Sequence, residues 1–239
     1  MSIKKAIILG DVHIPYQNNK ALNIIYQILK EHKFDEIILG GDIIDGTQLS
    51  KFPNYEEYEL ELWQEINLFK NFINNLKEVS PKSKIIYLED NHFSERLKRY
   101  MIEHPELKNL IKIDLPVDKV IEYNKPYFPF GQRQLGFIHG YNSNKYFAEK
   151  YTREFNHNLV VCHTHTFQHY VAENGIECYG IGCLCKTMKY LRNKPHRWRN
   201  GFGVFIYDTK IRKYWFETYE IKDGYCYFNN KLYKFTVGD

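Results

Sequence analysis

The sequence lacks long hydrophobic runs, paired cysteine motifs and a strong excess of charge of either sign. None of its apolar stretches is long enough to span a membrane, and the four apolar residues from Ala6 to Leu9 are too few for a signal-peptide core. The five cysteines are an odd number and contain no Cys-x-x-Cys pair, so they predict no disulfide framework. We therefore expect a cytoplasmic protein that does not associate with membranes.

The charge balance is weak, because a net charge of +4 over 239 residues does not by itself indicate a nucleic-acid-binding protein. Linkers, internal repeats and low-complexity segments are also absent from the sequence. Aromatic residues, in contrast, are abundant at 16%, within a hydrophobic content of 44%. This composition is typical of a folded protein and excludes disorder, and we predict one domain over residues 1–239.

Short apolar strands alternate with amphipathic helices over the first ninety residues. The strands are expected at residues 5–10, 36–41 and 84–88, and the spacing of apolar residues predicts helices over 18–33 and 55–77. The order strand, helix, strand, helix, strand predicts a parallel sheet covered by helices.

The rest of the chain shifts towards short strands. Before residue 165 the pattern predicts helices at 93–103 and 142–155, strands at 133–138 and 158–162, and an irregular stretch between residues 105 and 129. Later strands are expected at 169–172, 176–180, 203–207, 214–219, 225–228 and 232–235, with turn signals at Asn174-Gly175 and Asp223-Gly224. From these strands we predict a second, mostly antiparallel sheet over residues 168–236, packed on the first.

Polar residues follow five of the predicted strands at their carboxyl ends, which is where open α/β sheets bind ligands. They are Asp11, His13, Asp42, Asp45, Asn91, His92, His139, His163 and His165. Two divalent metals about 3.5–4 Å apart need about this many oxygen and imidazole donors, with one carboxylate shared. Asp, Asn and His donors without cysteine suit Mn, Fe or Zn. The alternative, that each residue is a separate turn or helix-capping residue, explains one residue more easily than nine.

His163 and His165 are two positions apart at the end of a predicted strand. In a strand this spacing directs both side chains to the same side. The two imidazoles could therefore bind one metal or two neighbouring metals, and the spacing alone leaves both possibilities open.

The order of these residues resembles that of the calcineurin-like metallophosphoesterases, in particular compact phage and bacterial members. The matching blocks, which cover residues 6–165, are Asp11-x-His13, Gly41-Asp42-x-x-Asp45, Asn91-His92, His139 and Cys162-His163-Thr164-His165. The resemblance implies a layered α/β/β/α sandwich of two mixed sheets flanked by helices, the metallo-dependent phosphatase fold.

Three positions depart from the family pattern, and none of them is an expected ligand. Asp90 replaces the usual glycine before Asn91, Phe93 replaces an acid, and Cys162 replaces the glycine before His163. Because aspartate adopts positive φ less readily than glycine, we expect the loop after residue 88 to be less regular than in the family.

The resemblance also implies a role for each residue. Asp11, His13 and His165 would bind one metal, Asn91, His139 and His163 would bind the other, and Asp42 would bridge the two. His92 would be the non-ligand histidine beside the scissile phosphate, and Asp45 would orient it. The expected cofactors are two divalent ions, Mn first, with Fe, Zn or Ni as alternatives. A hydroxide bridging them would attack phosphorus, and His92 would protonate the leaving oxygen.

The leading function is a phosphodiesterase or nuclease that acts on nucleotides or nucleic acid. The basic segment 186–199 favours it, because Arg197 and Arg199 could pair with phosphates and His196 could stack on a base, although a solvated loop explains the segment equally well. One alternative is a phosphomonoesterase acting on phosphoproteins or small molecules, and a second is a catalytically silent metal-binding scaffold. Asp45 is followed by Gly46-Thr47, whereas protein phosphatases carry Arg-Gly at this place, and this difference counts against a protein phosphatase.

Other residues give weaker signals. Cys178, Cys183 and Cys185 are expected to be buried thiols rather than a second metal site. Arg96, on a predicted helix, is expected to face solvent. The edge of the C-terminal strands could form a dimer surface, and the sequence leaves the oligomeric state open.

Overall fold

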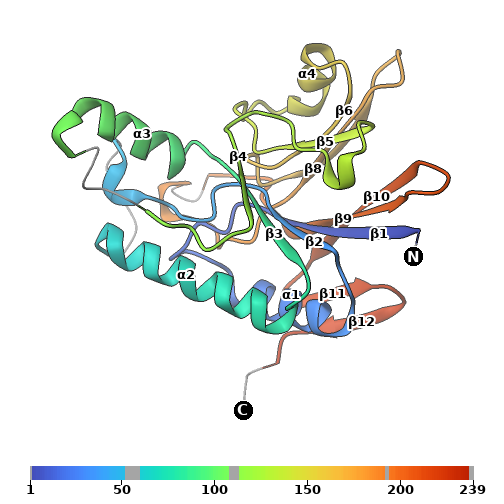
Figure 1. Cartoon of the computed structure of the whole chain (residues 1–239), viewed down its shortest axis with the longest axis horizontal. Coiled ribbons are helices and arrows are strands. Elements are labelled where there is room, and N and C mark those ends of the chain that lie inside the picture. The colour runs from blue at the N-terminus through green and yellow to red at the C-terminus, as the bar shows by residue number, and fades with distance from the viewer. Residues whose placement is uncertain (1, 52–59, 108–112, 192–193, 237–239) are drawn as a thin grey trace.

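Two mixed β-sheets lie face to face between layers of helix (Figure 1). The structure is a computed structural model that describes residues 2–51, 60–107, 113–191 and 194–236. Helices α1 (Asn19–Glu31) and α2 (Leu62–Val79) lie on the outer side of the first sheet, and α4 (Phe147–Glu154) lies on the outer side of the second. The predicted α/β/β/α sandwich of two mixed sheets is thereby confirmed.

The first sheet has six strands in the order β10-β9-β1-β2-β3-β4. Its parallel part consists of β1 (Ile3–Leu9), β2 (Glu36–Leu39), β3 (Lys84–Leu88) and β4 (Lys119–Ile121). Strand β9 (Asn200–Asp208) pairs antiparallel with β1, and β10 (Lys213–Ile221) pairs antiparallel with β9. Alternate residues of β1 enter different cores, since Ile7 and Leu9 pack towards the helices and Ile8 packs towards the second sheet. Both faces of this sheet are therefore buried.

The second sheet has four strands in the order β5-β6-β8-β7. They are β5 (Leu135–Ile138), β6 (Asn158–Val161), β8 (Glu177–Ile181) and β7 (Phe167–Val171), and only the β7–β8 pair is antiparallel. Phe137 and Val160 join Ile8 and Phe205 in the core between the two sheets, whereas Val161 packs beneath α4. This shared core fixes the carboxyl ends of the two sets of parallel strands beside each other.

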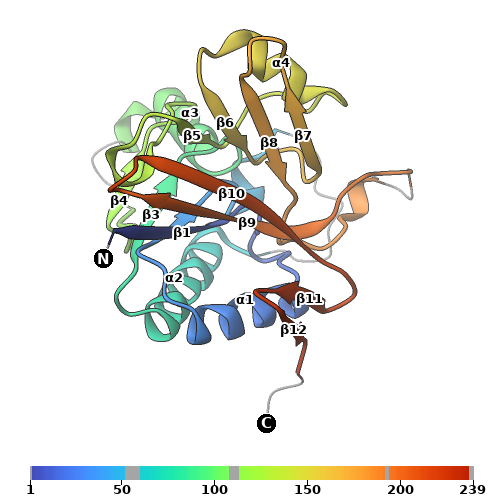
Figure 2. The ribbon, with the colours of Figure 1, turned by 90° about the vertical axis from the view of Figure 1, so that its right-hand side faces the viewer.

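The predicted separate C-terminal sheet over residues 168–236 is wrong, because its strands are divided between the two sheets and a hairpin. Strands β7 and β8 extend the second sheet, β9 and β10 extend the first, and β11 (Tyr225–Phe228) pairs with β12 (Lys231–Lys234) as a hairpin near α1 (Figure 2). Consecutive strands pair as hairpins here, as the local turn residues suggest, but β8 also pairs with β6, and β9 pairs with β1 at the other end of the chain. Local patterns do not contain that information.

Three smaller differences concern element boundaries. Helix α2 begins at Leu62, where Glu61 and Gln64 form a capping box, and residues 55–59 of the predicted helix lie outside the described part of the chain. The predicted helix over 142–155 shortens to α4, because Asn142 and Asn144 accept hydrogen bonds from backbone N–H groups two residues later and form turns. The short strand β4 lies within the stretch predicted to be irregular. The remaining helical elements are α3 (Ser94–Glu103), η1 (Thr47–Leu49), η2 (Pro105–Leu107), η3 (Pro129–Gly131) and η4 (Lys189–Leu191).

Candidate metal centre

The backbone at the strand ends is left-handed where most of the predicted ligands stand. The φ angles are +53° at Asp11, +50° at His13, +48° at Asp42, +64° at His163 and +58° at His165. Non-glycine residues rarely adopt this conformation, and it concentrates at sites where function requires a particular side-chain direction. Five of the seven predicted ligands share it, so the loops turn these side chains towards one region between the sheets.

A first group of donors meets around His165. Its Nε2 lies 3.2 Å from Nε2 of His13 and 3.2 Å from Oδ1 of Asp11, and His13 Nε2 lies 3.6 Å from Oδ2 of Asp42. Ligands bonded to one cation at about 2.0–2.2 Å stand about 3.0–3.4 Å apart. These separations suit a single cation shared by the four side chains.

A second group meets on the other side of Asp42. Oδ2 of Asp42 lies 3.3 Å from Nε2 of His139, which lies 2.9 Å from Oδ1 of Asn91. A nitrogen of His163 lies within 4.8 Å of donor atoms of both Asp42 and His139. The same carboxylate oxygen of Asp42 thus faces both groups.

Two buried polar atoms at this place have no hydrogen-bond partner among the described residues, namely Oδ1 of Asp11 and Nδ1 of His163. An unsatisfied buried donor or acceptor costs about 1–3 kcal/mol. A cation in each group would satisfy one of these atoms. The residues present therefore fit two divalent cations, and the structure supports divalent-metal binding.

The ring nitrogens that face away from the centre have partners that orient the rings. Nδ1 of His13 lies 2.8 Å from Oδ1 of Asp45, and Nδ1 of His139 lies 2.8 Å from the backbone oxygen of Gly40. Hydrogen bonds of this kind place the proton on Nδ1 and leave the Nε2 lone pair directed at the centre.

His92 lies beside the centre and shares Asp45 with His13. Its Nδ1 is 3.3 Å from Oδ1 of Asp45, and its Nε2 is 3.7 Å from Oδ2 of Asp42. The second oxygen of Asp45 accepts a 2.6 Å hydrogen bond from the hydroxyl of Thr47. Asp45 therefore contacts both histidines, and its shorter contact is with His13.

Arg96 fixes the same loop, contrary to the expectation that it faces solvent. Its Nη1 donates to the backbone oxygen of Asp45 at 2.9 Å and to that of Gly46 at 3.3 Å. The sequence reveals only its helical position, one turn after His92, and not the loop it reaches.

The charges of the centre balance one another. Burial alone would raise the pKa of Asp42, but the surrounding imidazoles, His139 first, hold that pKa well below its usual range. Burial would lower the pKa of His139 and of His165, but the nearby carboxylates of Asp42 and Asp11, respectively, raise these pKa values to about 9 and about 10. Without cations, imidazolium groups therefore neutralise the carboxylates.

His163 behaves differently from its neighbours. Burial and the adjacent His139 lower the pKa of His163 to about 4. Its ring is therefore neutral at physiological pH, which is the form that ligates a metal.

Asp90, which replaces the family's glycine, supports the centre from beneath. It is fully buried and accepts hydrogen bonds from the backbone N–H groups of Asp42, Phe93 and Ser94 and from the Tyr87 hydroxyl, at 2.5–3.1 Å. Burial and the charge of Asp42 raise the pKa of Asp90. It does not adopt positive φ. The carboxylate thereby caps the start of α3 and fixes the Asp42 loop.

Cys162, another departure from the family pattern, fills space that glycines leave open. A Cβ atom at Gly40 would lie 2.3 Å from the sulfur of Cys162, and one at Gly10 would lie 2.8 Å away. Gly41 has a φ of +86°, and a Cβ there would lie 2.5 Å from Nδ1 of His139. The strand-end glycines therefore allow the two sheets to approach at the centre.

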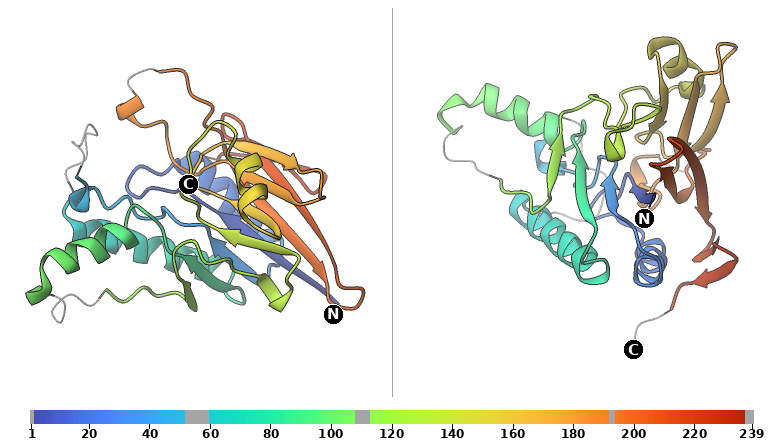
Figure 3. Two further views of the ribbon diagram at one scale, coloured as in Figure 1. Left: turned by 90° about the horizontal axis from the view of Figure 1, so that it is seen from above. Right: turned by 45° about the vertical axis from the view of Figure 1, so that its right-hand side comes forward.

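The basic segment 186–199 projects from the sheets (Figure 3). Arg197 donates to the backbone oxygen of Lys145 at 3.2 Å, Arg199 lies 3.4 Å from Glu220, and Nδ1 of His196 accepts a hydrogen bond from the backbone N–H of Trp198. None of these three predicted substrate-binding side chains has a described contact with the metal-ligand candidates, and residues 192–193 lie outside the described chain. The indole of Trp198 instead packs on His165, with ring centroids 4.0 Å apart.

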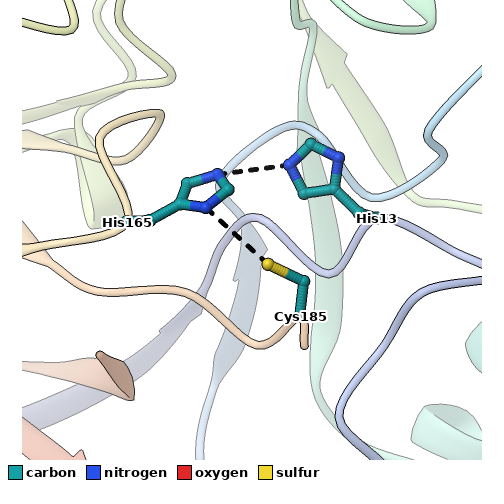
Figure 4. A group of neighbouring side chains, drawn as sticks. All are labelled: His13, His165 and Cys185. Carbon is teal, nitrogen blue, oxygen red and sulfur yellow. Dashed lines mark hydrogen bonds between the residues drawn. The ribbon is translucent and has the colours of Figure 1, made fainter. Parts of the chain in front are cut away.

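The cysteines are all free and buried. Cys178 packs beneath α4, as expected for a core thiol. Cys185 differs, because its sulfur lies 3.7 Å from Nδ1 of His165 and its donor atom groups with those of His13 and His165 (Figure 4). Apart from the Cys-x-Cys alternation, nothing in the sequence indicates this contact.

Comparison with known proteins supports the same class. Residues 4–78 match the family model of the calcineurin-like phosphoesterases. This segment of the chain contains the Asp11-x-His13 and Gly41-Asp42-x-x-Asp45 blocks. The predicted family resemblance is thereby confirmed over residues 4–78, and it supports a hydrolase. A search of curated proteins finds no match.

Among solved structures, Vacuolar Protein Sorting 29 from Cryptosporidium parvum aligns with a TM-score of 0.56 and 14% identity, covering 97% of this chain and 96% of that protein. Vps29 from Entamoeba histolytica, solved with Zn²⁺, aligns with a TM-score of 0.44 and 10% identity over 95% of each chain. The first similarity shows that the fold is shared along nearly the whole chain.

Within the described ranges, none of the helices combines the length and the apolar character that crossing a membrane requires.

Proposed function

We propose that this protein is a metal-dependent phosphoester hydrolase with a dinuclear centre. The observation that carries the proposal is the position of Asp42, whose Oδ2 faces two separate groups of donors. Asp11, His13 and His165 would hold one cation, Asn91, His139 and His163 would hold the other, and Asp42 would bind both. When bound, two divalent cations polarise a phosphoryl group and lower the pKa of water. Mn²⁺ is the first candidate for these oxygen and nitrogen donors, with Fe, Zn and Ni as alternatives.

His92 is the proposed general acid. It is not needed as a ligand. Its side chain is 23% exposed to solvent, and its Nε2 faces the centre, 3.7 Å from Oδ2 of Asp42. Asp45 contacts Nδ1 and so holds the ring in one orientation. A proton on Nε2 could then pass to the leaving oxygen of a substrate, a contribution of typically 10²–10⁴-fold.

The proposed substrate is a phosphodiester, in a nucleotide or a nucleic acid. Trp198 supports this choice, because its indole lies against His165 and offers an aromatic surface beside the centre. A phosphomonoesterase is the second candidate, since Arg197 and Arg199 are engaged by Lys145 and Glu220 rather than directed at the centre. Every donor position is filled, which argues against a silent scaffold.

The test compares turnover of bis-p-nitrophenyl phosphate and p-nitrophenyl phosphate by the metal-free chain reloaded with Mn²⁺. We expect faster turnover of the diester and loss of turnover with a chelator. Preference for the monoester would support the second candidate. If metal analysis finds two bound cations and neither compound is hydrolysed, the chain is a scaffold.

The substrate-binding prediction has its own test. If Arg197 and Arg199 contact the substrate, replacing both by alanine should raise KM for a nucleotide diester and leave kcat unchanged, because only ground-state binding is lost. Lys210→Ala, which removes a positive charge from the β9–β10 turn, is the matched control. An unchanged KM in the double variant would remove the basic segment from the site.

A further inference from the structure

The histidines of the centre differ in what holds the nitrogen that faces away from it. His13 and His92 contact a carboxylate of Asp45, and His139 contacts the backbone oxygen of Gly40. For His165 the corresponding atom, Nδ1, faces the sulfur of Cys185 at 3.7 Å (Figure 4). The ring of His165 is thus oriented by a thiol where the rings of His13, His92 and His139 have oxygen.

The sequence around Cys185 explains how the sulfur reaches this position. Leu184 stands at a bend and is buried among the core residues of the helix layer, whereas Cys183 and Cys185 on either side of it pack together in a separate cluster with Met188. The N–H of Leu184 lies 3.1 Å from the backbone oxygens of both Gly10 and Asp11. The segment is therefore tied to the loop that carries Asp11, and Cys185 itself is only 2% exposed.

Two further contacts limit the movement of the His165 ring. The indole of Trp198 packs against it, and the backbone oxygen of His165 accepts a 2.9 Å hydrogen bond from the N–H of Arg199. Cys183 also contacts the ring, but its thiol lies 3.5 Å from the backbone oxygen of Arg199, to which it donates. The sulfur of Cys183 accepts a 3.7 Å hydrogen bond from Nδ2 of Asn200, whereas the sulfur of Cys185 lies 3.7 Å from Nδ1 of His165.

We propose that Cys185 is a positioning residue for the first cation. Its sulfur accepts a hydrogen bond from Nδ1–H of His165, which leaves the Nε2 lone pair directed at Oδ1 of Asp11 and Nε2 of His13. The inference rests on the proposed function, because it assumes that a cation binds between these atoms. Partners that orient a metal-ligating histidine typically contribute 10–100-fold to metal affinity.

The experiment is calorimetric titration of the metal-free, full-length chain with Mn²⁺. In Cys185→Ala we expect one of the two binding constants to fall about 10–100-fold and the other to stay unchanged. Cys185→Ser keeps an acceptor and should recover part of the affinity, which a purely packing role would not predict. Cys178→Ala is the matched control, since it empties a buried thiol site beneath α4, away from the centre.

Each result has a defined meaning. If the wild-type chain binds no Mn²⁺, the proposed function fails before the role of Cys185 is addressed. If the wild type binds two ions and Cys185→Ala binds both equally well, the positioning role is overturned. The positioning role is also overturned if Cys185→Ser binds Mn²⁺ as weakly as Cys185→Ala does, or if Mn²⁺ binding is weakened by Cys183→Ala alone. Should Cys185→Ala fail to fold, Cys185→Val fills the space without an acceptor and takes its place.

Discussion

The two sheets contribute different chemistry to the centre. The parallel strands of the first sheet supply all the oxygen donors, Asp11, Asp42 and Asn91, together with His13, whereas the second sheet supplies only imidazoles, from His139, His163 and His165. The first sheet alone would present clustered carboxylates, and the second alone would present clustered histidines. A centre that suits two divalent cations exists only where the sheets pack together, so its integrity depends on the core between them.

The largest effect is expected at the one side chain that faces donors from both sheets. Asp42→Asn replaces the shared carboxylate by a neutral amide, so both cations lose their common anionic ligand. Mn²⁺ affinity and turnover should each fall by more than about 100-fold. Calorimetry and diester hydrolysis measure the two losses. Asp35→Asn, which removes a carboxylate that pairs with Lys4 at the opposite end of β1, should change neither.

His92→Asn separates chemistry from binding. Because His92 is not a predicted ligand, the variant should bind Mn²⁺ like the wild type, while kcat falls about 10²–10⁴-fold. His104→Asn, at the far end of α3, is the control. Full activity in the His92 variant would show that the ring has no part in proton transfer.

The dependence on the core between the sheets can be tested away from any donor. Phe205 is fully buried there and contacts Phe137 of the second sheet, with ring centroids 5.6 Å apart. Phe205→Ala should cost about 3–5 kcal/mol of unfolding free energy and also weaken Mn²⁺ binding. Phe72→Ala, in the core between the helices and the first sheet, should destabilise the protein with little effect on Mn²⁺ affinity. Equal losses of affinity in both variants would contradict the dependence on inter-sheet packing.

The smallest effect concerns the loop after Asp45, which belongs to the first sheet alone. Glu65 accepts a 2.8 Å hydrogen bond from the N–H of Gly46, and burial raises the pKa of Glu65 to about 7. The folded state therefore binds the proton more tightly than the unfolded state, whose pKa is about 4.3, so wild-type stability should decline between about pH 4.3 and pH 7. The decline amounts to roughly 4 kcal/mol at most, since each unit of pKa difference corresponds to about 1.4 kcal/mol.

Glu65→Gln keeps an acceptor and cannot ionise, so this part of the pH dependence should disappear. Urea unfolding of both proteins from pH 4 to pH 8 gives the comparison. Parallel pH profiles would show that Glu65 does not ionise differently in the folded state.

The sequence predicted the centre better than it predicted the sheets around it. The ligand candidates follow strands whose apolar runs are local and unambiguous, and the rule that ligands lie at the carboxyl ends of parallel strands brings them together without knowledge of strand order. The sheet that each C-terminal hairpin joins is decided by contacts of β8 with β6 and of β9 with the distant β1, and so the C-terminal sheet was predicted wrongly.

The residues that the sequence did not reveal act through contacts of the same long range. Asp90 was interpreted as a disruptive replacement of glycine, but its carboxylate collects N–H groups from the Asp42 loop and from α3. Cys185 is twenty residues from His165 and meets it only because residues 183–185 lie along the Asp11 loop. Spacing identifies candidate ligands, but the groups that orient them are defined by the fold.

The most direct test of the dinuclear centre is anomalous diffraction from a crystal soaked with Mn²⁺. Two peaks should lie on either side of Oδ2 of Asp42, one bound by Asp11, His13 and His165 and the other by Asn91, His139 and His163. A single peak, or one ion bound by both His163 and His165, would contradict the division of these histidines between two cations.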